Sequence, residues 1–134
     1  MKLPIRLSKD SREPIYHQIE KQLKALIAGG HLQAGASLPS IRVLSKDLEV
    51  SVITTRRAYQ NLEQKGFIET VQGKGTFVKH VDERLKEEVK IANVYQSFEK
   101  AVDTAYTYDY SRKQIEQIFR DVLNAYGRDK KGEL

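Results

Sequence analysis

Residues 38–59 read LPSIRVLSKDLEVSVITTRRAY, a stretch in which two helix starts lie close together. Ser40 can cap a short helix that runs to about Leu48, because its hydroxyl can accept a hydrogen bond from an amide of the first turn. Ser51 provides a second cap, for a helix that reaches about Lys65. Two helices joined by a turn of about three residues predict a helix-turn-helix.

Apolar residues at helical spacing predict one more helix upstream of this stretch, from about Pro14 to Gly29. Proline suits a helix start, and the pair Gly29-Gly30 is typical of a helix end. A tight turn at Ala34-Gly35 then leads into the helix-turn-helix. The residues expected on the buried face of this helix are Ile15, Ile19, Leu23, Leu26 and Ile27.

The apolar pattern changes from helical to strand-like after Gly66. Residues 67–71 and 76–79 are rich in β-branched and aromatic side chains, and the residues between them include Gly73 and Gly75. This pattern predicts a β-hairpin. A hairpin directly after a helix-turn-helix is a wing, and it must rest its apolar face on the helices because two strands alone are not stable.

Two further amphipathic segments follow in residues 81–134. One helix is expected from Val81 to about Ala105, and another after Ser111, where Ser111 and Gln114 match a capping box and Gly127 ends the helix. We therefore expect a mostly α protein with a small β-hairpin. It would have an N-terminal winged helix-turn-helix over residues 1–80 and a C-terminal α-helical hairpin over residues 81–134.

Charge is distributed unevenly between these two parts. The 134-residue chain carries 23 Lys and Arg against 18 Asp and Glu, a net charge of +5. Residues 1–80 hold 13 basic and 7 acidic side chains, whereas residues 81–134 hold 10 and 11, so the whole basic excess lies in the N-terminal part. A localised excess favours a polyanionic partner, although an imbalance of this size also occurs in proteins without one.

Several classes of function are disfavoured by what the sequence lacks. The absence of cysteine excludes a disulfide scaffold, a thiolate metal cluster and a cysteine nucleophile. The three histidines are isolated from one another, and no serine-nucleophile elbow or phosphate loop is present, so we expect no enzyme, no metal and no cofactor. Charged residues interrupt the apolar runs of residues 1–30, so we expect a cytoplasmic protein without a membrane span.

Residues 51–57 place short hydroxyl side chains and two arginines in the first two turns of the second helix of the helix-turn-helix. These turns enter the major groove in proteins with this motif. Hydroxyl groups can reach phosphate oxygens, and arginine can bind guanine O6 and N7. Arg56 and Arg57 point about 100° apart. At most one of them therefore lies centrally in a groove, while the other meets phosphate or another side chain, unless both are simply exposed helix formers.

A series of motifs over about residues 12–80 resembles the GntR family of bacterial transcription regulators. The motifs are LPSIRVL at 38–44, VS followed by Thr54, Arg56 and Ala58-Tyr59, then LE at 62–63, GFI at 66–68 and GKGTFV at 73–78. The short remainder is similar to the YtrA-type subgroup, whose small C-terminal region dimerises. The resemblance implies a DNA-binding regulator with a winged helix-turn-helix, more often a repressor than an activator.

The resemblance also implies roles for individual residues. Arg42 matches a family arginine that contacts DNA, and Gly73 with Lys74 matches the wing tip that enters the minor groove. Val52 departs from the family pattern, because many members carry arginine at this position. From the residues and the resemblance together, the set expected to face DNA is Ser40, Arg42, Ser51, Thr54, Thr55, Arg56, Arg57, Gly73 and Lys74.

The C-terminal hairpin carries more apolar surface than one hairpin can bury, so we hypothesise a homodimer. The rival interpretation is packing within one chain. A dimer would bind double-stranded DNA as an inverted repeat with half-sites about one helical turn apart. A winged helix that binds an acidic protein partner is the alternative function. The expected dimer interface is Phe98, Val102, Ile115, Phe119 and Val122.

Three tyrosines, Tyr106, Tyr108 and Tyr110, cluster at the junction between the two C-terminal helices. They could line a pocket for an unidentified effector. Aromatic residues at a helix junction more commonly serve in packing, and we favour that interpretation.

Overall fold

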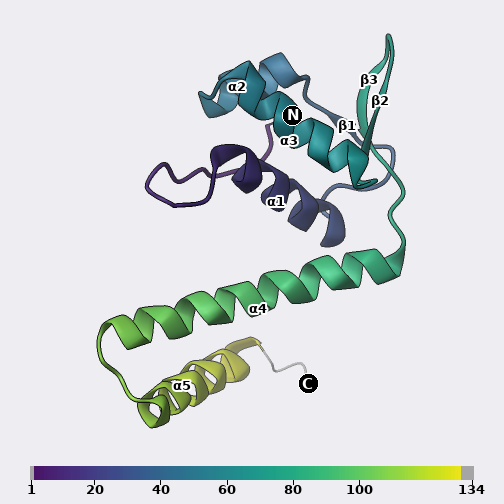
Figure 1. Ribbon diagram of the computed structural model, residues 1–134. Coiled ribbons are helices and arrows are strands. Elements are labelled where there is room, and N and C mark those ends of the chain that lie inside the picture. The colour runs from purple at the N-terminus through teal and green to yellow at the C-terminus, as the bar shows by residue number, and fades with distance from the viewer. Residues whose placement is uncertain (1, 131–134) are drawn as a thin grey trace. The chain divides into compact units, whose positions relative to one another are not determined.

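The computed structural model describes residues 2–130 and, among them, the side chains of residues 2–127 (Figure 1). They form two compact units that divide between Asn93 and Val94, inside a long helix. The elements in chain order are α1 (Ile15–Ala28), β1 (Ser37–Leu38), α2 (Ile41–Leu48), α3 (Val52–Gln64), β2 (Ile68–Val71), β3 (Gly75–Val78), α4 (Glu83–Thr107) and α5 (Arg112–Lys130).

The core of the first unit lies between α1, α2, α3 and the sheet. α1 turns its expected apolar face inward, with Ile19 and Leu23 fully buried. It packs on α3, whose Ala58 and Leu62 are fully buried as well. The predicted helical stripe is thus confirmed. The buried apolar cluster is Leu3, Ile5, Ile19, Leu23, Ile27, Leu32, Leu38, Leu44, Ala58, Tyr59, Leu62, Phe67, Ile68, Val78 and Val81.

The two serine caps predicted from the sequence are both present. The Ser40 Oγ accepts a hydrogen bond from the Val43 amide at 3.1 Å, and the Ser51 Oγ accepts one from the Thr54 amide at 3.1 Å. Between the two helices Glu49 adopts a left-handed conformation with φ 57°, which ends α2 and reverses the chain. The helix-turn-helix is therefore formed as expected.

The wing is part of a three-stranded antiparallel sheet in the order β1-β3-β2. β2 and β3 form the predicted hairpin, with Thr70 opposite Thr76, and Figure 1 shows this hairpin extending beyond the helices. β1 pairs with β3, with Ser37 opposite Phe77, and was not predicted. A strand of two residues is too short to show any alternation, and its partner is distant in sequence, so local pattern could not reveal it.

The segment before α1 is held against the rest of the first unit. The sequence did not predict this attachment. Leu3 and Ile5 are buried, and the side chain of Gln18 bonds the backbone of Ser8 in both directions, at 2.8 and 2.9 Å. Gln22 does the same at Arg6, at 2.9 and 2.7 Å. Two amides on α1 thus anchor an irregular segment that has no periodic signal of its own.

The first turns of α4 belong to the first unit. Val81 is 3% exposed, and Leu85 and Val89 pack against the core. The division expected after His80 therefore falls within the first compact unit, because the apolar residues that follow it complete that core.

The second unit contains the rest of α4 and α5. The capping box is confirmed: the Gln114 amide donates to the Ser111 Oγ at 3.2 Å, and the Ser111 amide donates to the Gln114 Oε1 at 2.8 Å. The predicted helix end at Gly127 is wrong, because α5 continues to Lys130. One glycine inside a helical run costs only about 1 kcal/mol, which does not terminate a helix.

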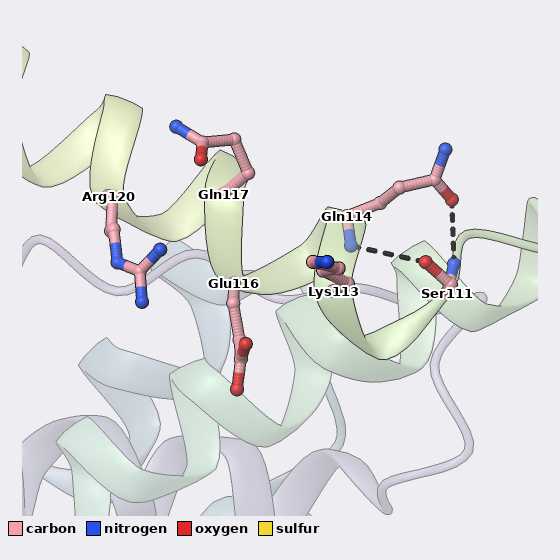
Figure 2. A pocket seen from close by; sticks show the side chains of 6 residues that line it. All are labelled: Ser111, Lys113, Gln114, Glu116, Gln117 and Arg120. Atoms are coloured by element: carbon pink, nitrogen blue, oxygen red, sulfur yellow. Dashed lines mark hydrogen bonds between the residues drawn. The ribbon is translucent and has the colours of Figure 1, made fainter.

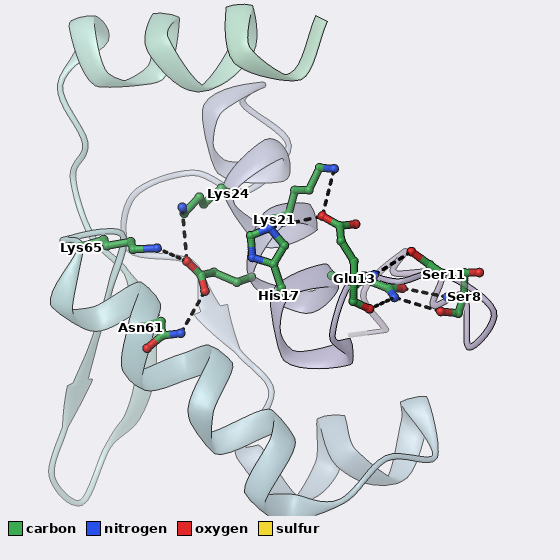
Figure 3. Close-up of polar contacts among 10 residues, drawn as sticks. Ser8, Ser11, Glu13, His17, Lys21, Lys24, Asn61 and Lys65 are labelled. Carbon is green, nitrogen blue, oxygen red and sulfur yellow. Dashed lines mark hydrogen bonds and ion pairs between the residues drawn. The ribbon is translucent and has the colours of Figure 1, made fainter. Parts of the chain in front are cut away.

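A buried carboxylate joins α1 to α3. Glu20 is 2% exposed and accepts a hydrogen bond from the Asn61 Nδ2 at 3.1 Å, while its Oε2 pairs with the Lys24 ammonium at 3.3 Å and with Lys65. Figure 3 shows Lys24, Asn61 and Lys65 converging on this one carboxylate. Burial alone would raise the pKa of Glu20, but together Lys65, Asn61 and Lys24 outweigh it and hold that pKa below its usual value.

We expect Glu20→Gln to lower the free energy of unfolding by about 1–3 kcal/mol at pH 7, because the neutral amide loses two ammonium partners at a buried position. The ionised carboxylate stabilises the fold above the usual carboxyl pKa, and this contribution is lost as the pH falls through the lowered native pKa. Urea unfolding at pH 7 and in acid measures both effects, so the wild-type advantage should shrink in acid.

The matched control is Glu87→Gln, which breaks an exposed ion pair with Lys90 on α4 and should change stability by less than about 1 kcal/mol. An equal effect of the two substitutions would contradict the role given to Glu20.

Candidate nucleic-acid interface

α3 has two faces that differ sharply in burial. Thr55, Ala58, Tyr59 and Leu62 are turned into the core. The opposite face is exposed and carries side chains at the helical spacing i, i+3, i+4 and i+7. The residues of this outward face are Ile53, Arg56, Arg57 and Gln60.

The two adjacent arginines have different surroundings. The guanidinium of Arg57 lies 3.9 Å from the ring centroid of Tyr16 on α1. This cation–π contact holds the Arg57 side chain against α1. Arg56 is exposed and makes no side-chain bond or ion pair within the described part of the chain. The sequence left open which of the two arginines meets another side chain. In the structure Arg57 has such a partner, and Arg56 is available to a ligand.

The expectation that Thr55 faces DNA is wrong, because its side chain is fully buried. Its neighbour Thr54 is on the cap, where its Oγ1 lies 2.8 Å from the Ser51 Oγ. The spacing of the two threonines explains the difference: Thr55 lies three residues before Ala58 and four before Tyr59, on the core face. The Thr55 Oγ1 has no hydrogen-bond partner among the described residues.

We expect Thr55→Val to leave DNA binding unchanged and to raise the free energy of unfolding by about 1 kcal/mol, because a buried hydroxyl without a partner is replaced by a methyl group of similar size. Thermal or urea unfolding together with a DNA-binding titration measures both quantities. A folded variant that had lost DNA affinity would show that the hydroxyl does contact DNA.

α2 contributes a cation close to its own start. Arg42, the second residue of α2, is exposed, and neither α2 nor α3 has an acidic residue in its first turn. The hydroxyls of Ser40 and Ser51 both accept a cap hydrogen bond, and the Ser40 O–H can still donate to a ligand. The Ser51 hydroxyl is also hydrogen-bonded to the Thr54 hydroxyl. Helix starts with amide groups and nearby cations attract phosphate.

Tyr59 fixes α3 against the segment that leads into α2. Its phenolic oxygen donates to the Pro39 carbonyl at 2.7 Å, and the residue is 3% exposed. Burial raises the pKa of Tyr59, so the phenol stays protonated and keeps donating. The two helix starts at Ser40 and Ser51 are thereby held in one arrangement.

The wing tip is built from residues 72–74. The Lys74 amide donates to the Val71 carbonyl at 2.9 Å, and Gly73 has φ +80°, a conformation that disfavours any residue with a side chain. Lys74 is exposed at the tip. The expected DNA-facing residues other than Thr55 are thus exposed or, for Thr54, partly exposed, and all belong to the first unit.

The set of DNA-facing residues expected from the sequence lacks three residues of this surface: Ile53, Gln60 and Tyr16. Gln60 completes the outward stripe of α3, and its spacing of four residues from Arg56 was a usable signal. The contact of Tyr16 with Arg57 joins two helices far apart in sequence, and nothing local indicated it.

The described residues of the second unit offer apolar surface and no cluster of side chains suited to a metal ion. Phe98 and Phe119 form an edge-to-face pair with ring centroids 5.6 Å apart, yet they remain 49% and 45% exposed. Tyr106, Tyr108 and Tyr110 are exposed as well, so the single chain does not bury them, and the interpretation that they serve in packing stays a prediction.

An open depression at the start of α5 is shown in Figure 2. The side chains that line it come from Ser111 and the first turns of one helix, and the hydrogen bonds drawn there are those of the capping box. No other helix or strand contributes to the lining given for this depression. The described residues also contain no group of three side chains suited to a metal ion.

None of the helices in the described part of the chain combines the length and the apolar character that a membrane crossing requires.

Known proteins share both the sequence and the fold. The sequence profile of bacterial regulatory proteins of the gntR family matches residues 15–78. The transcriptional repressor YtrA of Bacillus subtilis is 30% identical over 114 residues, which cover 85% of each chain. A GntR family transcriptional regulator from Listeria monocytogenes superimposes with a TM-score of 0.64 at 30% identity, over 84% of this chain and 97% of that one.

A third relative is YtrA from Sulfolobus acidocaldarius, described as a GntR-family transcription factor. Its structure superimposes with a TM-score of 0.55 at 39% identity and covers 69% of this chain and 97% of its own. Similarity at this level extends well beyond the winged helix-turn-helix. The chain therefore belongs to the gntR family of bacterial regulatory proteins, and it is a DNA-binding transcription regulator and not an enzyme.

Proposed function

We propose that the protein is a dimeric repressor that binds an operator with inverted-repeat symmetry. The observation that carries this proposal is the outward face of α3, where Arg56 lies exposed on the second helix of a helix-turn-helix. A wing with Lys74 at its tip belongs to the same unit. Repression is the favoured sign of action because the B. subtilis relative is named a repressor.

Dimerisation is supported by the exposed apolar surface of the second unit. A monomer rarely leaves so many large apolar side chains in water along two neighbouring helices. We propose that the five residues expected from the sequence lie in this interface, and four of them are at least 37% exposed, while Ile115 is partly buried. The exposed large apolar side chains from Val94 onward are Val94, Tyr95, Phe98, Val102, Tyr106, Tyr108, Tyr110, Ile118, Phe119, Val122, Leu123 and Tyr126.

Two-fold symmetry of the dimer would determine the orientation and spacing of the two operator half-sites. Two copies of α3 related by a two-fold axis would enter successive major grooves, so the half-sites should be inverted and about one helical turn apart. Any effector would act by favouring one separation of the two recognition helices, since a ligand shifts an equilibrium only by binding one state more tightly. We also propose a cytoplasmic location, because the DNA partner lies there.

We propose different DNA contacts for the basic residues because their surroundings differ. Arg56 has no partner among the described residues to give up and can bind a base edge. Arg57 would have to leave the Tyr16 ring, so it is better placed for a phosphate at the groove edge. Arg42, Ser40, Ser51 and Thr54 at the two helix starts, and Gly73 with Lys74 at the wing, complete the proposed DNA-contacting set.

We expect Arg56→Ala to weaken operator binding by about 5- to 150-fold and to leave binding to random DNA nearly unchanged, because a bidentate contact to guanine provides about 1–3 kcal/mol of discrimination. Arg57→Ala should weaken binding to both DNAs by a similar, smaller factor, since a phosphate contact carries no sequence information. Titrations of labelled operator and random duplexes at one fixed salt concentration measure both ratios.

The control is Lys100→Ala, which removes one exposed positive charge from α4 in the second unit. It should leave both affinities within about twofold. Unchanged operator affinity in the Arg56 variant would contradict the assignment of this arginine to a base.

We expect Val122→Glu to convert the dimer to a folded monomer and to weaken operator binding, because it places a charge in the proposed apolar interface. Val122 is 52% exposed in the single chain, so the substitution should not unfold α5. Sedimentation measures the mass and circular dichroism the helix content. The matched control is Asn124→Glu, an exposed polar position on the same helix. A wild-type chain that sediments as a folded monomer at micromolar concentration would refute the dimer.

A further inference from the structure

The first turn of α3 carries two exposed apolar side chains that the DNA contacts described so far do not use. Val52 is 37% exposed and Ile53 is 76% exposed. They are the two large apolar residues of α3 that lie exposed, and the other residues on its outward face are charged or polar: Arg56, Arg57 and Gln60.

The stability of the fold does not explain these two side chains. The α3 start is already capped by Ser51, and the core contacts of the helix come from Thr55, Ala58 and Tyr59 on the other face. β-Branched residues are also weaker helix formers than the straight-chain polar residues that an exposed helix start could carry. An isoleucine with three quarters of its surface in water, on the helix face that carries Arg56, is therefore available to the partner of that face.

The surrounding charge identifies what kind of partner this is. Arg42 and Arg56 are exposed on the same helix-turn-helix, and the first acidic residue of α3 is Glu63, near its far end. The outward face of α3 from Ile53 to Gln60 carries two arginines and no acidic residue, whereas the exposed acids Asp47 and Glu49 lie on α2 and in the turn. A basic helix face with a small apolar centre is complementary to the major groove, which is lined by phosphates and exposes one apolar group, the C5-methyl of thymine.

We propose that Ile53 and Val52 contact thymine C5-methyl groups, so that each operator half-site has thymine where the first turn of α3 meets the base pairs. This inference rests on the proposed DNA-binding role of the outward face of α3. It assigns to that face a second kind of readout beside the hydrogen bonds of Arg56. Adenine–thymine pairs under the helix start would thus be distinguished by methyl contact rather than by a charged side chain.

The test uses deoxyuridine, which differs from thymidine only by the missing methyl group. An operator is first selected from random duplexes with the full-length wild-type protein, and each thymine of one half-site is then replaced in turn. We expect at least one replacement to weaken binding by roughly fourfold, the effect of removing one buried methyl group.

Protein variants connect that loss to the two side chains. With Ile53→Ser or Val52→Ser, each of which removes every methyl group from its position, the sensitive duplexes should lose most of their dependence on the thymine methyl group. Gln60→Ala, on the same outward face of α3, should keep the full dependence. Ile53 and Val52 lie outside the buried core, so circular dichroism should show these variants folded.

The outcomes separate the two claims. A selected operator whose affinity does not change with any thymine replacement overturns the methyl contact and leaves the proposed function standing. If binding still depends on the thymine methyl group in both the Ile53 and the Val52 variants, another residue makes the contact. That result also overturns the inference and leaves the proposed function standing. Failure to select any sequence overturns the proposed function and, with it, this inference.

Discussion

The first unit depends on one buried carboxylate. Glu20 on α1 is almost inaccessible to water, and a charge in that position is stable only when it is paired. Its partners Asn61 and Lys65 lie at the far end of α3 and just beyond it, so the pairing fixes how α3 lies on α1. Apolar contacts between these helices are non-directional, and the carboxylate adds hydrogen bonds and ion pairs that have a direction.

A fixed α3 gives the protein two distinct faces on one helix. Adjacent residues separate them: Thr55 is turned into the core, while Arg56 lies in solvent. At the start of the helix, Tyr59 bonds the Pro39 carbonyl and holds the approach to α2 in place. Side-chain-to-backbone contacts of this kind hold a DNA-binding surface in its binding geometry before DNA is bound. The entropy lost on binding is therefore smaller.

The sequence predicted the features that depend on local pattern. The Ser40, Ser51 and Ser111 caps and the hairpin formed as expected, because a few consecutive residues determine each of them. The sequence did not reveal β1, the buried Leu3 and Ile5, or the stacking of Arg57 on Tyr16, because each depends on a partner distant in sequence. Thr55 was misassigned by residue type, although its spacing from Tyr59 placed it on the core face.

We propose that the outward face of α3 binds a specific operator as part of a symmetric dimer. Hydroxyl-radical footprinting of the full-length protein on the DNA upstream of its own coding sequence tests this most directly. We expect two protected regions, related by inverted sequence and centred about one helical turn apart. Protection that is absent, or that spreads evenly along the fragment and disappears at moderate salt, would contradict it.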